Sequence, residues 1–279
     1  MADQGDPLAR IADALERLAG GRCAATDWRA APAYVWDGSD GRRIAAIDAP
    51  PLQLLKGIDS QRDAVAQNVA RLARGHAAHD MLLWGARGMG KSALVRAAVV
   101  SAQENEPRAL ALVQASTGAL EMLPRLFAEL GRVERNFLVF VDDLGFSDDD
   151  SVGPRHLRSW LEGGVEARPS NVRLAVTSNR RAIVPRQANE QDTVSHGPLN
   201  PRDAVDDKLA LADRFGLAIG FHNASQDDYL AIVAGYAAEH GLSWDESDAL
   251  EWARRRGARS GRTAWQYVNE LAGRAGRAF

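Results

Sequence analysis

The sequence predicts an α/β fold, in which a parallel β-sheet carries helices on both faces and a small helical domain follows it. Short apolar segments alternate with amphipathic ones through the middle of the chain, the pattern of a doubly wound sheet. Residues 137–141 are uninterrupted apolar residues, as expected of a strand buried on both faces. Strand signals cease after residue 221, and three helical patterns follow.

Length, composition and charge restrict the class of protein. A chain of 279 residues can bury one such core and still carry smaller appendages. The hydrophobic fraction of 46% is that of a globular protein, and no apolar run approaches the roughly 18 residues of a membrane span. The net charge of −3 gives no global basic field that would favour nucleic acid. Cys23 is the only cysteine and no secretory signal begins the chain, so we expect a cytoplasmic protein without disulfides.

Three regions are expected along the chain. Residues 1–51 form an N-terminal segment with a helix over 7–18 and a hairpin over 34–47, ended by Pro50 and Pro51. Residues 52–222 form the α/β domain, and residues 223–279 form a helical lid. The irregular stretch 181–200 is too long for an ordinary connection and is therefore expected to be functional.

The individual elements follow from periodicity and from their end signals. A five-stranded parallel sheet is predicted, with strands at 81–84, 109–114, 137–141, 172–177 and 217–221. The helices of this domain are predicted at 60–74, 91–103 and 120–130, and those of the lid at 225–240, 245–256 and 261–272.

The first predicted strand leads into a phosphate-binding motif. The residues of this segment that are expected to contact a nucleotide are Gly85, Ala86, Arg87, Gly88, Met89, Gly90, Lys91, Ser92 and Ala93. The first eight match the P-loop (Walker A) pattern G-x-x-x-x-G-K-[ST] and lie between a strand and a helix, as this motif requires. Glycines let backbone N–H groups surround a phosphate, while Lys91 supplies a charge to the β- and γ-phosphates. The alternative is a glycine-rich turn that matches by chance.

Two carboxylates follow the apolar strand 137–141. A P-loop site needs a second, metal-side carboxylate at the end of another strand, so Asp142 is expected to share a Mg²⁺ ion with the Ser92 hydroxyl. Asp143 would then act as the general base for the attacking water. Glutamate is commoner in that role and is one methylene longer, so an acidic turn without catalytic function is the alternative.

Together these segments resemble the AAA+ ATPase superfamily, and within it a stand-alone bacterial family known only as a domain of unknown function. The resemblance extends from Leu52 to the C-terminus. It rests on the P-loop and on Val141-Asp142-Asp143-Leu144, Leu161-Glu162-Gly163-Gly164, Thr177-Ser178-Asn179-Arg180-Arg181, Asp213-Arg214-Phe215-Gly216 and Ser260-Gly261-Arg262.

The resemblance implies roles for residues outside the P-loop. It makes Asn179 a polar sensor beside the γ-phosphate, and Arg214 an arginine inserted into the nucleotide site of a neighbouring subunit. Arg262 would contact the nucleotide from the lid, and Gly57 and Ile58 would read the adenine edge. The alternatives are a turn asparagine, an exposed ion pair of Arg214 with Asp213 or Asp206, and a solvated basic face around Arg262.

The expected function is that of an ATPase that binds Mg-ATP, forms a homo-oligomer and remodels an unknown protein partner. The loop 115–119 lacks the aromatic residue of peptide-pulling relatives, which disfavours axial pulling. A slowly hydrolysing nucleotide switch or loader is the alternative, because of Asp143. A DNA-linked role rests only on fold analogy and on the arginines between 254 and 277. A small-molecule kinase is disfavoured by Asn179, Arg214 and the lid.

Overall fold

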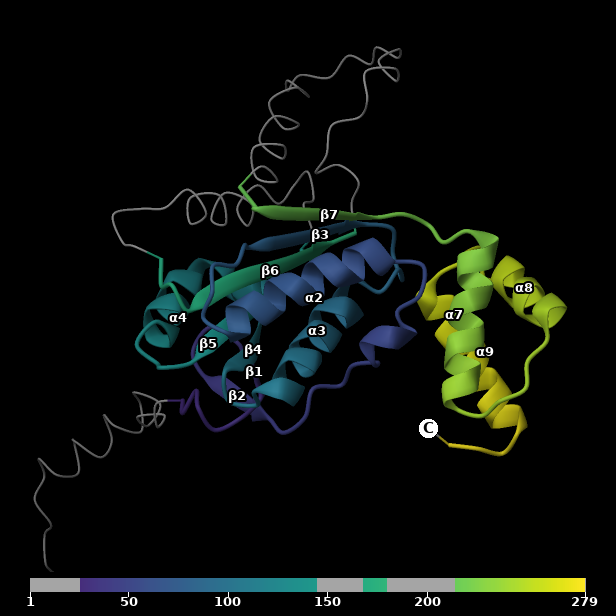
Figure 1. Cartoon of the computed structure of the whole chain (residues 1–279), viewed down its shortest axis with the longest axis horizontal. Helices are drawn as coiled ribbons and strands as arrows, with labels where there is room; N and C mark the ends of the chain where they lie inside the picture. The colour runs from purple at the N-terminus through teal and green to yellow at the C-terminus, as the bar shows by residue number, and fades with distance from the viewer. Residues whose placement is uncertain (1–25, 145–167, 180–213, 279) are drawn as a thin grey trace, which may run out of the picture.

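The computed structural model describes residues 26–144, 168–179 and 214–278 (Figure 1). Within these ranges one sheet has the strand order β2-β1-β4-β5-β6-β3-β7. The strands are β1 Ala33–Trp36, β2 Gly41–Ile44, β3 Met81–Gly85, β4 Leu110–Ala115, β5 Asn136–Val141, β6 Val172–Ser178 and β7 Leu217–Phe221. Neighbouring strands are parallel except for β1 and β2, which form an antiparallel hairpin.

The α/β fold is confirmed, but the sheet has seven strands in the described residues where five were predicted. The five predicted strands are β3 to β7, and the N-terminal hairpin adds the other two because β1 pairs in parallel with β4. Burial of aromatic residues explains this pairing, since Tyr34 and Trp36 are each only 1% exposed. Local sequence shows that a hairpin forms and carries no information about which strand it joins.

Polar contacts fasten the residues before β1 to the sheet. The guanidinium of Arg135, which precedes β5, is buried and donates to the carbonyl oxygens of Trp28 at 3.1 Å and Ala31 at 2.7 Å. The Tyr34 hydroxyl donates to the Asp27 carbonyl at 2.7 Å. Residues 27–36 are therefore an integral part of the α/β core.

Helices cover both faces of the sheet. Helices α2 (Asp59–Ala73) and α3 (Lys91–Asn105) lie on one face, and α4 (Leu123–Leu130) lies on the other (Figure 1). Strand β5 shows the consequence, since Leu138 and Phe140 pack on the α3 side while Phe137 and Val139 pack on the α4 side. Two short 3₁₀ helices, η1 (Leu52–Leu54) and η2 (Thr117–Met122), precede α2 and α4.

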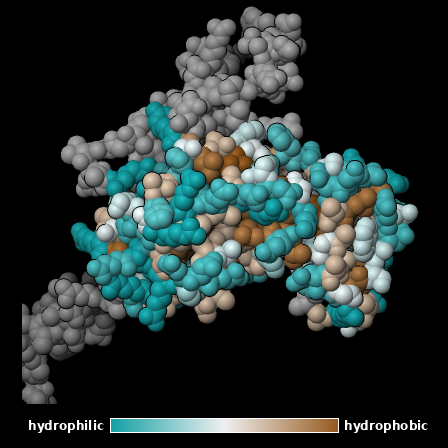
Figure 2. Space-filling model, in the orientation of Figure 1, coloured by the Kyte–Doolittle hydropathy of each residue, from teal (hydrophilic) through white to brown (hydrophobic). Residues whose placement is uncertain are grey.

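Three helices form the lid beside one end of the sheet (Figure 1): α7 (Gln226–Glu239), α8 (Glu246–Arg255) and α9 (Gly261–Arg274). Side chains of Ser225, Asp245 and Ser260 cap their N-termini. Tyr229 and Tyr267 are fully buried and join the same core cluster as α2 and α3. On the face shown in Figure 2, hydrophobic side chains gather where the α/β domain meets the lid.

No helix in the described ranges is long and apolar enough to cross a bilayer. The helix predicted over 7–18 and the irregular stretch 181–200 lie outside the described residues.

Candidate functional site

The loop from Gly85 to Ser92 connects β3 to α3 in a conformation that requires its glycines. Gly85, Gly88 and Gly90 have φ angles of 119°, 75° and 86°, which L side chains rarely adopt. A Cβ on Gly85 would lie 2.1 Å from the carbonyl oxygen of Phe221 on β7. The same oxygen accepts a hydrogen bond from the Ala86 N–H at 2.8 Å. The edge strand β7 therefore holds the beginning of the loop in place.

Lys91 is buried at the start of α3, with 5% of its surface exposed. Its ammonium donates to the carbonyl oxygens of Gly85 at 3.0 Å and Ala86 at 2.8 Å, and to the Asn179 side-chain oxygen at 3.0 Å. Burial lowers the pKa of Lys91, while the carboxylates of Asp143 and Asp142 oppose this effect. The loop thus concentrates a desolvated positive charge, which suits an anionic ligand.

A chain of short hydrogen bonds joins α3 to the carboxyl ends of β5 and β6. Asp142 Oδ1 accepts from the Ser92 hydroxyl at 2.5 Å and from the Thr177 hydroxyl at 2.6 Å. Thr177 also accepts from the Asp143 N–H at 2.8 Å. Ser92 and Asp142 are therefore adjacent, as predicted. Thr177 was not predicted as a site residue. Threonine is common in β-strands, so its presence near the end of β6 does not by itself indicate a polar role in a site.

Asp143 has a φ of 52°, and no other non-glycine residue in the described ranges has a positive φ. The side-chain amide of Asn179 donates to Asp143 Oδ1, and the Arg87 guanidinium lies 4.0 Å from Asp143 Oδ2. Backbone strain of this kind concentrates at functional sites. The structure therefore brings Lys91, Asn179 and Asp143 together at one edge of the sheet.

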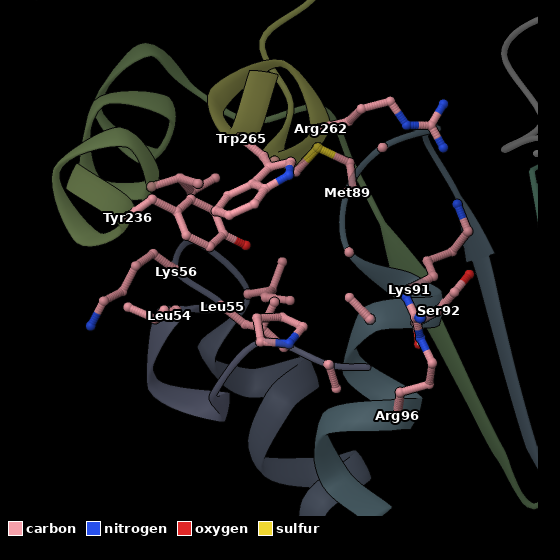
Figure 3. A pocket seen from close by; sticks show the side chains of 18 of the residues that line it. Leu54, Leu55, Lys56, Met89, Lys91, Ser92, Arg96, Tyr236, Arg262 and Trp265 are labelled. Carbon is pink, nitrogen blue, oxygen red and sulfur yellow. The ribbon is translucent and has the colours of Figure 1, made fainter. Parts of the chain in front are cut away.

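A cavity of about 630 Å³ opens over this edge, between the α/β domain and the lid (Figure 3). The predicted residues that line it are Ile58, Gly88, Met89, Gly90, Lys91, Ser92, Ala93, Asp142, Asp143, Asn179 and Arg262. Gly57, Gly85, Ala86 and Arg87 are not among its lining residues. A Cβ on Gly57, where φ is 71°, would lie 3.0 Å from the Asp228 Cβ, so this glycine permits close packing against α7.

Lid side chains that were not predicted form the other end of the cavity. Tyr236 on α7 and Trp265 on α9 meet edge to face, with ring centroids 5.1 Å apart, and Leu54 and Ile232 also line this end (Figure 3). His240 lies 5.6 Å from the Trp265 ring. Each aromatic residue fits the helical periodicity of its own segment, so the sequence gives no sign that they face a shared cavity.

The lid touches the P-loop directly through the start of α9. The Arg262 N–H donates to the Gly88 carbonyl oxygen at 3.1 Å. A Cβ on Gly88 would lie 2.9 Å from the Ser260 hydroxyl and 3.2 Å from the Arg262 Cβ. The P-loop backbone at Gly88 is therefore packed directly against the lid.

Arg214 lies away from this cavity. It precedes β7, whose first residue Leu217 pairs with Met81 at the start of β3, whereas the P-loop follows the end of β3. Because these strands are parallel, Arg214 lies at the opposite edge of the sheet. Phe215 is buried, and a Cβ on Gly216 would lie 2.3 Å from His79 Nδ1, so the backbone next to Arg214 is tightly packed. The preceding residues 180–213 lie outside the described residues.

The parallel order β4-β5-β6-β3-β7, the P-loop after the fourth of these strands and the helical lid define the fold of the AAA+ P-loop nucleoside triphosphatases. Solved structures agree with this assignment. A variant of RuvB from Thermotoga maritima has a TM-score of 0.52 at 16% identity, over 81% of this chain and 66% of RuvB. ORC1 from Aeropyrum pernix, solved in complex with DNA, has a TM-score of 0.55 at 16% identity, over 81% of this chain and 65% of ORC1.

Residues 29–275 match the family described as "Protein of unknown function (DUF815)", and the chain belongs to this family. The chain spans about two thirds of the length of the RuvB and ORC1 chains. No curated protein matches the sequence.

Proposed function

We propose that this protein binds Mg-ATP in the cavity and hydrolyses it to ADP and phosphate, and that this reaction drives a conformational change in a protein partner. The observation that carries the proposal is the continuous polar chain in which Ser92, Asp142 and Thr177 lie beside Lys91, Asn179 and Asp143. Groups that suit a phosphate, a metal ion and a general base thus lie together at the start of α3 and at the ends of β5 and β6.

The two ends of the cavity match the two ends of a nucleotide. Loop N–H groups, the N-terminus of α3 and the buried Lys91 ammonium suit phosphates. The apolar end with Tyr236 and Trp265 suits a base. Backbone groups at Ile58, which lines the cavity, would read the edge of the base, with Gly57 next to it in the chain. The ammonium of Lys91 would exchange its hydrogen bonds to loop carbonyls for stronger, charge-assisted bonds to phosphate oxygens.

Mg²⁺ fits the oxygen donors at the end of β5. The Ser92 hydroxyl and the Asp142 carboxylate would hold it, and a bound Mg²⁺ neutralises charge on the phosphates. No group of three His, Cys, Asp or Glu side chains converges within the described ranges, so phosphate oxygens and water would complete the coordination. Thr177 holds the Asp142 carboxylate in place from β6.

Hydrolysis requires a base close to the γ-phosphate. Asp143 would take a proton from water as the water oxygen bonds to the γ-phosphorus and the bond to the ADP oxygen breaks. Asn179, which already contacts both Lys91 and Asp143, would orient the water and the phosphate. Since Arg214 lies at the opposite edge of the sheet, it would serve a neighbouring subunit in a homo-oligomer.

A second candidate is a nucleotide switch that hydrolyses ATP slowly. Two features of Asp143 favour this switch: its backbone is strained, and Asn179 already holds its carboxylate. In addition, an aspartate side chain is shorter than that of the glutamate usual at this position. The two candidates share one site and differ in turnover rate, which a steady-state ATPase assay measures.

The test compares three variants. Asp143→Asn should bind ATP normally and lose about 10²-fold in kcat, the usual contribution of a general base. Asp142→Ala should need more Mg²⁺ for half-maximal activity. Lys91→Ala should lose most ATP affinity in calorimetry because a charge-assisted phosphate contact is removed. A folded Lys91→Ala protein with unchanged ATP affinity would contradict the assignment of this site.

A further inference from the structure

Arg87 and Lys91 are the two charged residues of the P-loop, and the Arg87 side chain has no role in the reaction proposed above. The Arg87 side chain is 75% exposed, and among the described residues it forms an ion pair with Asp143, 4.0 Å away, whose side chain is 56% exposed. Exposed pairs of this kind contribute little to stability, so the fold does not need this arginine. A role in the reaction would explain why this arginine lies beside Asp143, the proposed general base.

The backbone on both sides of Arg87 is held in place. Ala86 donates to Phe221 of β7, and Gly88 accepts from Arg262 of α9, so the sheet and the lid each fix one neighbour. The Arg87 side chain consequently starts from a defined point of the P-loop, next to Gly88, which lines the cavity. It is directed to the Asp143 oxygen that Asn179 does not contact.

Arg87, Asp143, Asn179 and Lys91 form a continuous series of polar contacts. If Lys91 and Ser92 hold the β- and γ-phosphates, as proposed above, this series surrounds the position of the γ-phosphate. Asp142 and Arg262 are the other charged groups close to Lys91. A guanidinium stays charged at all working pH values and matches two phosphate oxygens at once, so it would exchange a weak carboxylate contact for a stronger one.

We propose that Arg87 is a catalytic arginine supplied by the same subunit, which moves from Asp143 to the γ-phosphate when ATP binds. This inference rests on the proposed function. The guanidinium keeps its protons and stabilises the charge that develops as the water oxygen bonds to phosphorus and the bond to ADP breaks. Its departure frees the Asp143 carboxylate to accept the proton of the water.

The experiment measures single-turnover ATP hydrolysis and ATP affinity for Arg87→Ala, Arg87→Lys and the control Arg74→Ala. Arg74 is exposed after the end of α2, away from the cavity. Arg87→Ala should lower the rate constant by about tenfold or more and change the dissociation constant of ATP by less than about threefold, since the contact forms mainly in the transition state. Arg87→Lys should recover part of the rate, and Arg74→Ala should match the unmutated protein. Unchanged or faster hydrolysis by Arg87→Ala, with the protein folded, would overturn the inference.

A mixing experiment tests whether the arginine acts within its own subunit. Lys91→Ala protein offers an intact Arg87 but has no working P-loop, so adding it to Arg87→Ala should restore nothing. Recovery of activity in this mixture would overturn the assignment to the same subunit. An unmutated protein that neither binds nor hydrolyses ATP would instead contradict the proposed function itself, and this inference with it.

Discussion

At the scale of single residues, two aromatic side chains set the character of one end of the cavity. Tyr236 is 9% exposed, and burial raises the pKa of its hydroxyl, so it is uncharged at neutral pH. Trp265 meets it edge to face and lines the cavity. An aromatic surface of this kind binds a planar base by stacking, independently of any phosphate contact.

Trp265→Ala should therefore weaken ATP binding at least fivefold, from a stacking contribution of about 1–3 kcal/mol. Binding of inorganic tripolyphosphate should be unchanged, because Trp265 lies at the opposite end from the P-loop. Calorimetry with both ligands makes the comparison. Trp252→Ala is the matched control, since Trp252 lies on α8 and is not among the residues that line the cavity. Equal losses of affinity for ATP and for tripolyphosphate would show that Trp265 supports the lid and does not contact the base of the nucleotide.

At the scale of elements, the site depends on how closely β7 approaches the P-loop. Gly85 and Gly75 offer a comparison, because their φ angles are 119° and 70° and both would strain an alanine backbone. A Cβ on Gly75 meets nothing within 4 Å, whereas one on Gly85 would strike the Phe221 carbonyl at 2.1 Å.

Gly85→Ala should thus lower the free energy of unfolding by about 1–3 kcal/mol more than Gly75→Ala, the usual cost of overpacking. It should also weaken ATP binding, because relief of the clash moves the loop away from β7. Urea unfolding followed by circular dichroism measures the first effect, and calorimetry the second. Similar stabilities of the two variants would mean that β7 yields to the added methyl group and does not set the position of the loop.

At the scale of the whole molecule, Arg214 and the P-loop lie at opposite edges of one sheet. If activity needs both the P-loop and Arg214, the active site of a single subunit is incomplete, and a neighbouring subunit has to supply the arginine. The ATPase activity per subunit should then rise with protein concentration until the subunits associate, as measured together with mass by light scattering.

Arg214→Ala should bind ATP like the unmutated protein and hydrolyse it about 10²-fold more slowly or worse, as expected for an arginine that arrives from a neighbour. Mixed with Lys91→Ala, it should regain activity, since one partner supplies the P-loop and the other the arginine. This contrasts with the absence of recovery expected for Arg87→Ala. Full activity of Arg214→Ala at all protein concentrations would favour a monomeric switch.

The sequence by itself determined the elements whose signals are local. The run 137–141 predicts β5 because a short, uninterrupted apolar segment is typical of a strand in a sheet that is covered on both faces. The P-loop is recognisable because glycines and Lys91 must occur at fixed spacing for the backbone to turn around a phosphate. Asp142 could be predicted as a site residue because it follows a strand and a P-loop site needs a carboxylate there, whereas Asn179 was implied by the resemblance to the AAA+ superfamily.

Only the tertiary structure decided which segments meet. The pairing of β1 with β4, the Thr177 hydroxyl on Asp142, the Arg87 contact to Asp143 and the aromatic wall of the lid all join residues far apart in the chain. Each of these residues satisfies its local pattern equally well without its partner. Long-range contacts depend on how whole elements pack, and that packing is set by the burial of all apolar faces together.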